Sequence, residues 1–296
     1  MPVDAARWRV SLHGGHSREF CDHAYSSLRE MLEAAVAAGY HTFGVTEHAP
    51  RVEERFLYPN EVALGWDVPK LLADFERYAK TLPALVEEFA DRLVVLRGFE
   101  IEVVPAASYV SLMQDYRRRY AFEYIVGSVH YVNEISIDGS VEDFQQAIEA
   151  CGGVEPLAVW YYQTVAEMVT ALQPEVVAHL DLIKLHGRHF GLKETDAVRQ
   201  AAEEALEAVR STGGIVEVNT AGYRKGLGEP YPAPWLVQLA QQMGIGFCLG
   251  DDSHCVEQVG FGIEQARAYL LEQGVRTLTV ITREGHSLSR HEVSLE

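Results

Sequence analysis

The sequence contains few cysteines, and their spacing excludes two kinds of small-domain scaffold. Its 296 residues include four cysteines, at positions 21, 151, 248 and 255, and no two of them form a CxxC pair. Zinc ribbons need closely paired cysteines, and small secreted domains use several cysteines as a disulfide framework. Neither scaffold is expected here, and the four thiols are expected to be reduced.

Long apolar runs and a secretory leader are also missing. No segment reaches the roughly 18 uninterrupted apolar residues that a membrane-spanning helix needs. The first residues, MPVDAARWRVSLHGG, lack the basic start and apolar stretch of a signal peptide. We therefore expect a cytoplasmic protein with no membrane partner.

Positive charge is scarce. The chain has 25 basic and 43 acidic residues, a formal net charge of -18. Such a surface repels nucleic acid polymers and anionic membranes, so a small ligand is expected, and a phosphorylated one needs a local positive source. The glycine-rich segments 226–228 and 259–262 do not follow a strand with dinucleotide-motif spacing, which disfavours a Rossmann site.

Apolar, β-branched runs alternate with amphipathic stretches along the whole chain, the pattern of repeated βα units. Helices are expected at 26–39 and 68–92, the second broken or kinked at Pro83. No linker divides the chain, so residues 1–296 are expected to form one α/β domain, a (βα) barrel, with a doubly wound open sheet as the alternative. Strands are expected at 7–12, 42–48, 93–104, 123–132, 175–183, 215–222 and 245–254, with an eighth or edge strand at 277–284.

Polar side chains stand at the carboxyl end of every one of the seven strands. In a parallel barrel these ends meet on one face, where active sites lie. A single histidine at a strand end is more often a hydrogen-bonded loop residue, but so many imidazoles and carboxylates in one cleft would be costly to bury without a shared cation. The series is His13, His16, Glu47, His48, Glu100, His130, His179, Asp181, Glu217, Asn219, Asp251, Asp252 and His254.

The donor types narrow the choice of metal. Imidazoles with a few carboxylates and no thiolate suit zinc, manganese or iron, whereas magnesium and calcium prefer oxygen ligands. About nine ligands are too many for one ion. Two to three divalent ions are therefore expected, with open positions for water and substrate.

Several motifs occur in an order that resembles the polymerase and histidinol phosphatase (PHP) superfamily, in its stand-alone histidinol-phosphatase branch. Each segment lies at or near an expected strand end, and together they span most of the chain. They are FCDHA (20–24), TEHAP (46–50), GFE (98–100), SVH (128–130), AHLDLIK (178–184), EVNTAGYRKGLGEPYP (217–232) and LGDDSH (249–254) followed by VGFG.

This resemblance implies a distorted (βα)7 barrel with up to three metal ions at the carboxyl ends of its strands. It implies a first ion held by His13, His16, Glu100 and Asp252, a second by His23, His48 and His254, and a third by His130 and His179 with Glu100 bridging. The family motif is His-x-His, whereas this chain has one more residue between the pair. Both histidines can share an ion only if Gly14 and Gly15 form a bulge or turn.

The function that the resemblance implies is hydrolysis of L-histidinol phosphate, a phosphomonoester, in histidine biosynthesis. A metal-bridged water of lowered pKa would attack phosphorus, with Glu100, Asp252 and His254 as the catalytic residues. The alternatives are a phosphodiesterase or nucleotide phosphatase of the same superfamily and a non-catalytic metal-binding domain. Neither the oligomeric state nor the group that protonates the leaving alkoxide follows from the sequence.

The local positive source has two expected parts, the metal ions and the basic residues after the sixth strand. Arg224 is the preferred phosphate ligand, since a guanidinium can bind phosphate through two parallel hydrogen bonds, and Lys225 follows it. Lys184 is a weaker candidate. The alternative for Arg224 is a solvated loop charge.

Overall fold

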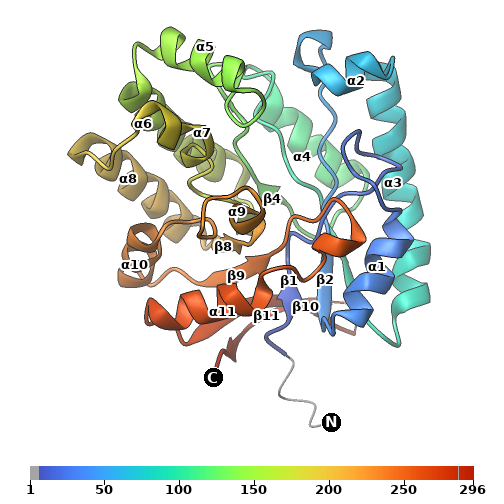
Figure 1. Cartoon of the computed structure of the whole chain (residues 1–296). Helices are drawn as coiled ribbons and strands as arrows, with labels where there is room; N and C mark the ends of the chain where they lie inside the picture. Colours follow the sequence, from blue (N-terminus) through green and yellow to red (C-terminus); the bar gives the residue numbers. More distant parts are fainter. Residues whose placement is uncertain (1–6, 286) are drawn as a thin grey trace.

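The computed structural model describes residues 7–285 and 287–296. Residues 1–6 of the N-terminal segment, where no leader is expected, lie outside the described residues. Strands occupy the middle of the molecule and helices surround them (Figure 1). The long helices are α1 (Leu28–Ala37), α3 (Val68–Phe89), α4 (Tyr109–Arg119), α5 (Val141–Cys151), α6 (Val154–Leu172), α8 (Asp196–Thr212), α10 (Pro234–Gln242) and α11 (Ile263–Glu272). Shorter ones are α2 (Pro59–Ala63), α7 (Lys184–Gly187) and α9 (Ala221–Arg224).

Two parallel sheets carry the fold. The first has the order β1-β2-β3 and the second β4-β7-β8-β9. Every ladder within them is parallel, as alternating βα units require. The strands are β1 (Val10–Ser11), β2 (Thr42–Val45), β3 (Val94–Arg97), β4 (Val126–Gly127), β7 (Val176–Val177), β8 (Ile215–Asn219) and β9 (Phe247–Gly250).

Backbone hydrogen bonds cross both gaps between the two sheets. On one side Leu12 N donates to Leu249 O over 2.9 Å. On the other side Ile101 N donates to Val126 O over 2.9 Å, and Glu100 forms an isolated parallel bridge with Val126. The ladders themselves remain two separate sheets in the described residues.

Two antiparallel hairpins complete the strands. One pairs β10 (Thr277–Glu284) with β11 (Ser287–Ser294) along their whole length, which makes the expected edge strand part of a terminal hairpin. The other pairs β5 (Tyr131–Val132) with β6 (Ile135–Ser136) just after β4.

The seven expected parallel strands exist but are shorter than predicted, because the backbone leaves the extended conformation where the polar residues begin, whereas the expected strand 277–284 has the predicted bounds. His179, after β7, has a φ of 25°, and Asp252, after β9, has a φ of 48°. Residues other than glycine seldom have a backbone in this left-handed region. The bends turn both residues out of the strand direction.

Of the break or kink expected at Pro83, the break is wrong, since α3 runs without interruption from Val68 to Phe89. Pro83 lies on the exposed side of the helix, where water can satisfy the backbone carbonyl that loses its partner. The opposite side buries Phe75, Tyr78 and Leu82, and their packing holds the helix together.

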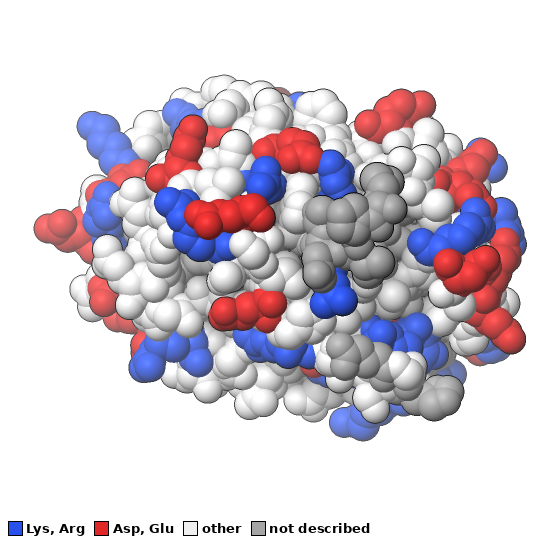
Figure 2. All heavy atoms as spheres, turned by 90° about the horizontal axis from the view of Figure 1, so that it is seen from below, with Lys and Arg blue, Asp and Glu red and all other residues white. Residues whose placement is uncertain are grey.

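The surface seen from below mixes acidic and basic side chains and shows no continuous patch of one sign (Figure 2). Among the described residues, no helix has the length and apolar character needed to cross a bilayer.

Candidate metal and substrate site

The polar residues that follow the parallel strands meet around one cavity of about 640 Å³. Four groups of potential ligand atoms lie in or beside it, and the atoms of each group are within 4.8 Å of one another. The cavity is lined by seven of the nine sequence-predicted ligands, namely His23, His48, Glu100, His130, His179, Asp252 and His254.

His13 and His16 complete the set from beneath the cavity, where both are fully buried. Their Nε2 atoms each lie 3.5 Å from Glu100 Oε2. Gly15 has a φ of 137°, and a Cβ atom there would lie 2.2 Å from Ser253 O. The expected glycine turn is therefore present and brings both imidazoles to the same carboxylate.

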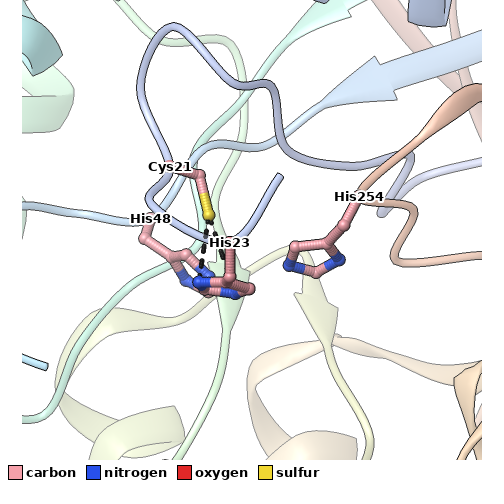
Figure 3. Close-up of side chains that lie close together, drawn as sticks. All are labelled: Cys21, His23, His48 and His254. Atoms are coloured by element: carbon pink, nitrogen blue, oxygen red, sulfur yellow. Dashed lines mark hydrogen bonds between the residues drawn. The ribbon is translucent and has the colours of Figure 1, made fainter. Parts of the chain in front are cut away.

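A second group joins the loop after β1 to the ends of β2 and β9. It consists of Cys21, His23, His48 and His254, and Figure 3 shows the four side chains close together. The His23 and His254 rings stack with centroids 4.6 Å apart. The three histidines are those predicted from the sequence as ligands of one ion, and the Cys21 thiol lies next to them.

Of the two remaining groups, one joins Glu100 to His130 and His179, and the other contains Asp252. Glu100 Oε1 lies 3.4 Å from His130 Nε2 and 3.1 Å from His179 Nε2. Asp252 Oδ1 lies 3.4 Å from His16 Nε2 and forms a group with His16 and His254. Glu100 thus touches two groups, as a bridging carboxylate must.

Further carboxylates stand behind the histidines. Glu217 Oε1 lies 3.0 Å from His13 Nδ1, and its Oε2 accepts hydrogen bonds from the backbone N of His179 and from Asn219 Nδ2. Glu102 Oε2 lies 3.2 Å from His130 Nδ1. Glu217 belongs to the predicted series of strand-end residues. Its position beside His13 indicates that it orients the imidazole ring.

Burial and neighbouring charges set the ionisation of the cluster. Burial lowers the pKa of His48 and His254, which favours the neutral imidazole that binds metals. Burial alone would raise the pKa of Glu100, but the surrounding His13, His130 and His48 hold it well below its ordinary value. Glu100 is therefore an anionic carboxylate among imidazoles.

Several buried polar atoms of the cluster make no hydrogen bond, namely both ring nitrogens of His16, Nε2 of His254 and Oε2 of Glu100. Buried polar atoms are normally paired, and a cation is a partner common to imidazole and carboxylate. The described residues thus fit a site for divalent ions.

The three basic residues predicted to bind phosphate differ in how close they lie to the cavity. Lys225 is exposed and lines the cavity. Arg224 Nη2 donates to the backbone O of Asp252 over 2.8 Å, which places the guanidinium beside the cluster, although Arg224 is not among the residues that line the cavity. Lys184 is buried with Nζ 2.9 Å from Pro230 O and 3.0 Å from Asp181 Oδ2, and it lines a different cavity from the one that the predicted ligands surround.

Comparisons with known proteins agree on one family. A sequence model of the family described as PHP domain matches residues 13–221. A probable histidinol-phosphatase of Schizosaccharomyces pombe is 34% identical over 278 residues, which cover 93% of this chain and 90% of that protein.

Two solved structures share the fold. A Listeria monocytogenes protein assigned as a histidinol phosphatase matches with a TM-score of 0.74 and 26% identity, covering 86% of this chain and 98% of that one. The histidinol phosphate phosphatase of Lactococcus lactis, solved with zinc, L-histidinol and phosphate, matches with a TM-score of 0.66 and 19% identity, covering 95% and 99% of the two chains.

Proposed function

Because the chain belongs to the PHP domain family, we propose that it is a metal-dependent phosphomonoesterase that hydrolyses L-histidinol phosphate to L-histidinol and phosphate. The observation that carries the proposal is the convergence of nine predicted ligands on one cavity and the buried turn beneath it. The similarity to the S. pombe protein over nearly the whole chain supports the choice of substrate.

The cofactor we propose is a set of two to three divalent ions, of zinc, manganese or iron. His13, His16, Glu100 and Asp252 would hold one ion, His23, His48 and His254 a second, and His130, His179 and Glu100 a third. Such ions supply a nucleophile at neutral pH by lowering the pKa of water, and they neutralise charge on phosphate oxygens.

The chain's own residues then bind and orient the substrate. Lys225 is the proposed phosphate-binding residue, because its ammonium is exposed at the cavity. Arg224 is proposed to act without contacting the phosphate, because its hydrogen bond to Asp252 O fixes the loop that carries Asp252 and His254. Glu100, Asp252 and His254 remain the proposed catalytic residues.

The proposed architecture is one domain built as a distorted (βα)7 barrel. The bridges at Gly15 with Ser253 and at Glu100 with Val126 link the two parallel sheets at both gaps, which supports a barrel whose ladders are interrupted. One contiguous apolar cluster extends from Trp8 to Leu295, as expected of one domain.

The test is phosphate release from L-histidinol phosphate, an aryl phosphate and a phosphodiester, each assayed with measured metal content. We expect the highest kcat/KM for L-histidinol phosphate. Preferred cleavage of the diester would contradict this proposal and identify the protein as a phosphodiesterase. Bound metal without any hydrolysis would replace it with a non-catalytic metal-binding domain.

A further inference from the structure

Arg51 is a buried arginine at the edge of the candidate site. It lies on the loop after β2, shortly after His48, and 3% of its surface is exposed. Arginine is almost never buried to this extent unless it is paired, because taking a charge out of water costs several kcal/mol. The partners of Arg51 therefore indicate what its charge does.

Two buried carboxylates pair with the guanidinium. Nη2 of Arg51 donates to Oε1 of Glu61, and Nη1 lies 3.8 Å from Oε1 of Glu102. Glu61 is 2% exposed and Glu102 is fully buried. Burial lowers the pKa of Arg51, but the nearby Tyr58 and these two carboxylates raise it by more, so the guanidinium is charged.

Glu102 connects this ion pair to a proposed metal ligand. Its Oε1 atom faces Arg51, and its Oε2 atom lies 3.2 Å from Nδ1 of His130. A carboxylate beside one ring nitrogen of a histidine fixes the tautomer in which the other nitrogen is free to bind a metal. That other nitrogen, Nε2, lies 3.4 Å from Oε1 of Glu100.

Tyr58 joins the same residues to the wall of the substrate cavity. The guanidinium of Arg51 lies 3.9 Å from the centroid of the Tyr58 ring, within the range of a cation–π interaction. Tyr58 Oη donates to Glu102 Oε1 over 3.3 Å, and Tyr58 N donates to Glu61 Oε2 over 2.7 Å. Because Tyr58 lines the cavity, these contacts form one network between the cavity wall and His130.

We infer that Arg51 is a positioning residue for His130: its charge holds Glu102 in the orientation in which Oε2 accepts a hydrogen bond from Nδ1 of that imidazole. Without the guanidinium, Glu102 would be a buried carboxylate with one partner fewer, and its hold on the ring would weaken. Arg51 does not line the substrate cavity, so it acts through Glu102. The inference rests on the proposed metal-dependent function and adds to it a residue that contacts none of the ions.

The test is zinc affinity, measured by competition with a chelator. Arg51→Met should weaken the binding of one zinc ion by about 10- to 100-fold, because His130 loses its fixed orientation. Arg51→Lys keeps the positive charge beside Glu102 and should recover most of that affinity. Excess zinc should restore phosphate release to Arg51→Met, since this variant lacks affinity for the ion rather than a group that touches the substrate.

Arg283→Met is the matched control. Arg283 forms a partly buried ion pair with Glu123, and neither residue lines the substrate cavity. This variant should have a lower Tm and unchanged zinc affinity. Wild-type zinc affinity in Arg51→Met would overturn the inference, as would an equal loss of affinity in Arg283→Met or in Arg51→Lys.

A second pair of variants keeps the test decisive if Arg51→Met does not fold. Arg51→Met leaves Glu61 buried without its cation, and the double variant Arg51→Met/Glu61→Gln removes that unpaired charge. Its zinc affinity is compared with that of Glu61→Gln alone. Weaker binding by the double variant supports the role of Arg51, and equal binding contradicts it.

The outcomes also separate this inference from the proposed function. Wild-type zinc affinity and phosphate release in Arg51→Met would remove only the role of Arg51. A loss of zinc affinity in Arg51→Met, in a protein whose wild type hydrolyses none of the phosphate esters, would support the role of Arg51 and remove the phosphatase proposal.

Discussion

Four histidines of the site have an oxygen atom near their Nδ1 atom. Glu217 serves His13, Glu102 serves His130, Asp22 serves His23, and the backbone O of Asp252 serves His254. Such contacts select the tautomer and orient the ring toward a metal. The sequence could name the histidines but could not pair Glu217 with His13 or Glu102 with His130, because these residues are far apart along the chain.

Glu217→Gln should weaken metal binding by about 10- to 100-fold, because a neutral amide orients His13 less strongly than a carboxylate does. The measurement is zinc affinity by competition with a chelator. Glu203→Gln, at an exposed position of α8, serves as the matched control and should bind zinc like the wild type. Wild-type affinity in Glu217→Gln would show that this carboxylate does not support the site.

Lys225→Ala should raise the inhibition constant of inorganic phosphate by about tenfold at unchanged metal content, because the cavity loses its exposed ammonium. Lys193→Ala, an exposed lysine that lines a different cavity, is the control. If both variants bind phosphate equally well, Lys225 is not the phosphate-binding residue.

Arg224→Ala should lower kcat/KM toward L-histidinol phosphate by at least about tenfold, through loss of the hydrogen bond that holds Asp252 O. Metal content should fall with it, which distinguishes this effect from that of Lys225→Ala. An unchanged kcat/KM would show that Arg224 has no role in hydrolysis, as expected of a solvated loop charge.

At the scale of elements, short strands followed by sharply bent loops position the ligands. The helices and strands were predictable from their periodicity, whereas the left-handed residues His179 and Asp252 carry no local signal. The turn at Gly14 and Gly15 was predictable as a possibility, because adjacent glycines permit it. Its direction depends on Ser253 from the opposite end of the chain.

Gly15→Ala should destabilise the protein by more than about 1 kcal/mol and reduce its metal content, because the new Cβ would collide with Ser253 O. Gly39→Ala is the matched control, since Gly39 also has a positive φ of 76° but no atom within 4 Å of the new Cβ. Urea unfolding and metal analysis test both. A Gly15→Ala protein no less stable than Gly39→Ala would contradict the close approach.

At the scale of the whole molecule, the ions are expected to contribute to stability as well as to hydrolysis. Their ligands come from loops that follow strands of both parallel sheets, so bound ions would link the two sheets at the carboxyl ends of the strands. Without them, the buried nitrogens of His16 and Oε2 of Glu100 have no hydrogen-bond partner.

Removal of metal by a chelator should therefore abolish phosphate release and lower the Tm, and zinc should restore both. An ion present at about a thousandfold above its Kd stabilises the folded state by about 4 kcal/mol. Calorimetry of the apo and zinc-loaded protein tests this expectation. Full activity in a protein shown to be free of metal would remove the metal-dependent mechanism.

The sequence by itself determined which βα units form and which histidines and carboxylates follow the strands, because periodicity and strand ends are local properties. Only the tertiary structure decided that Cys21 lies beside His23 and that Lys184 is held by Asp181 and Pro230. It also placed Glu217 behind His13. These outcomes depend on which distant segments approach one another, and that is settled by the packing of the whole chain rather than by any stretch of it.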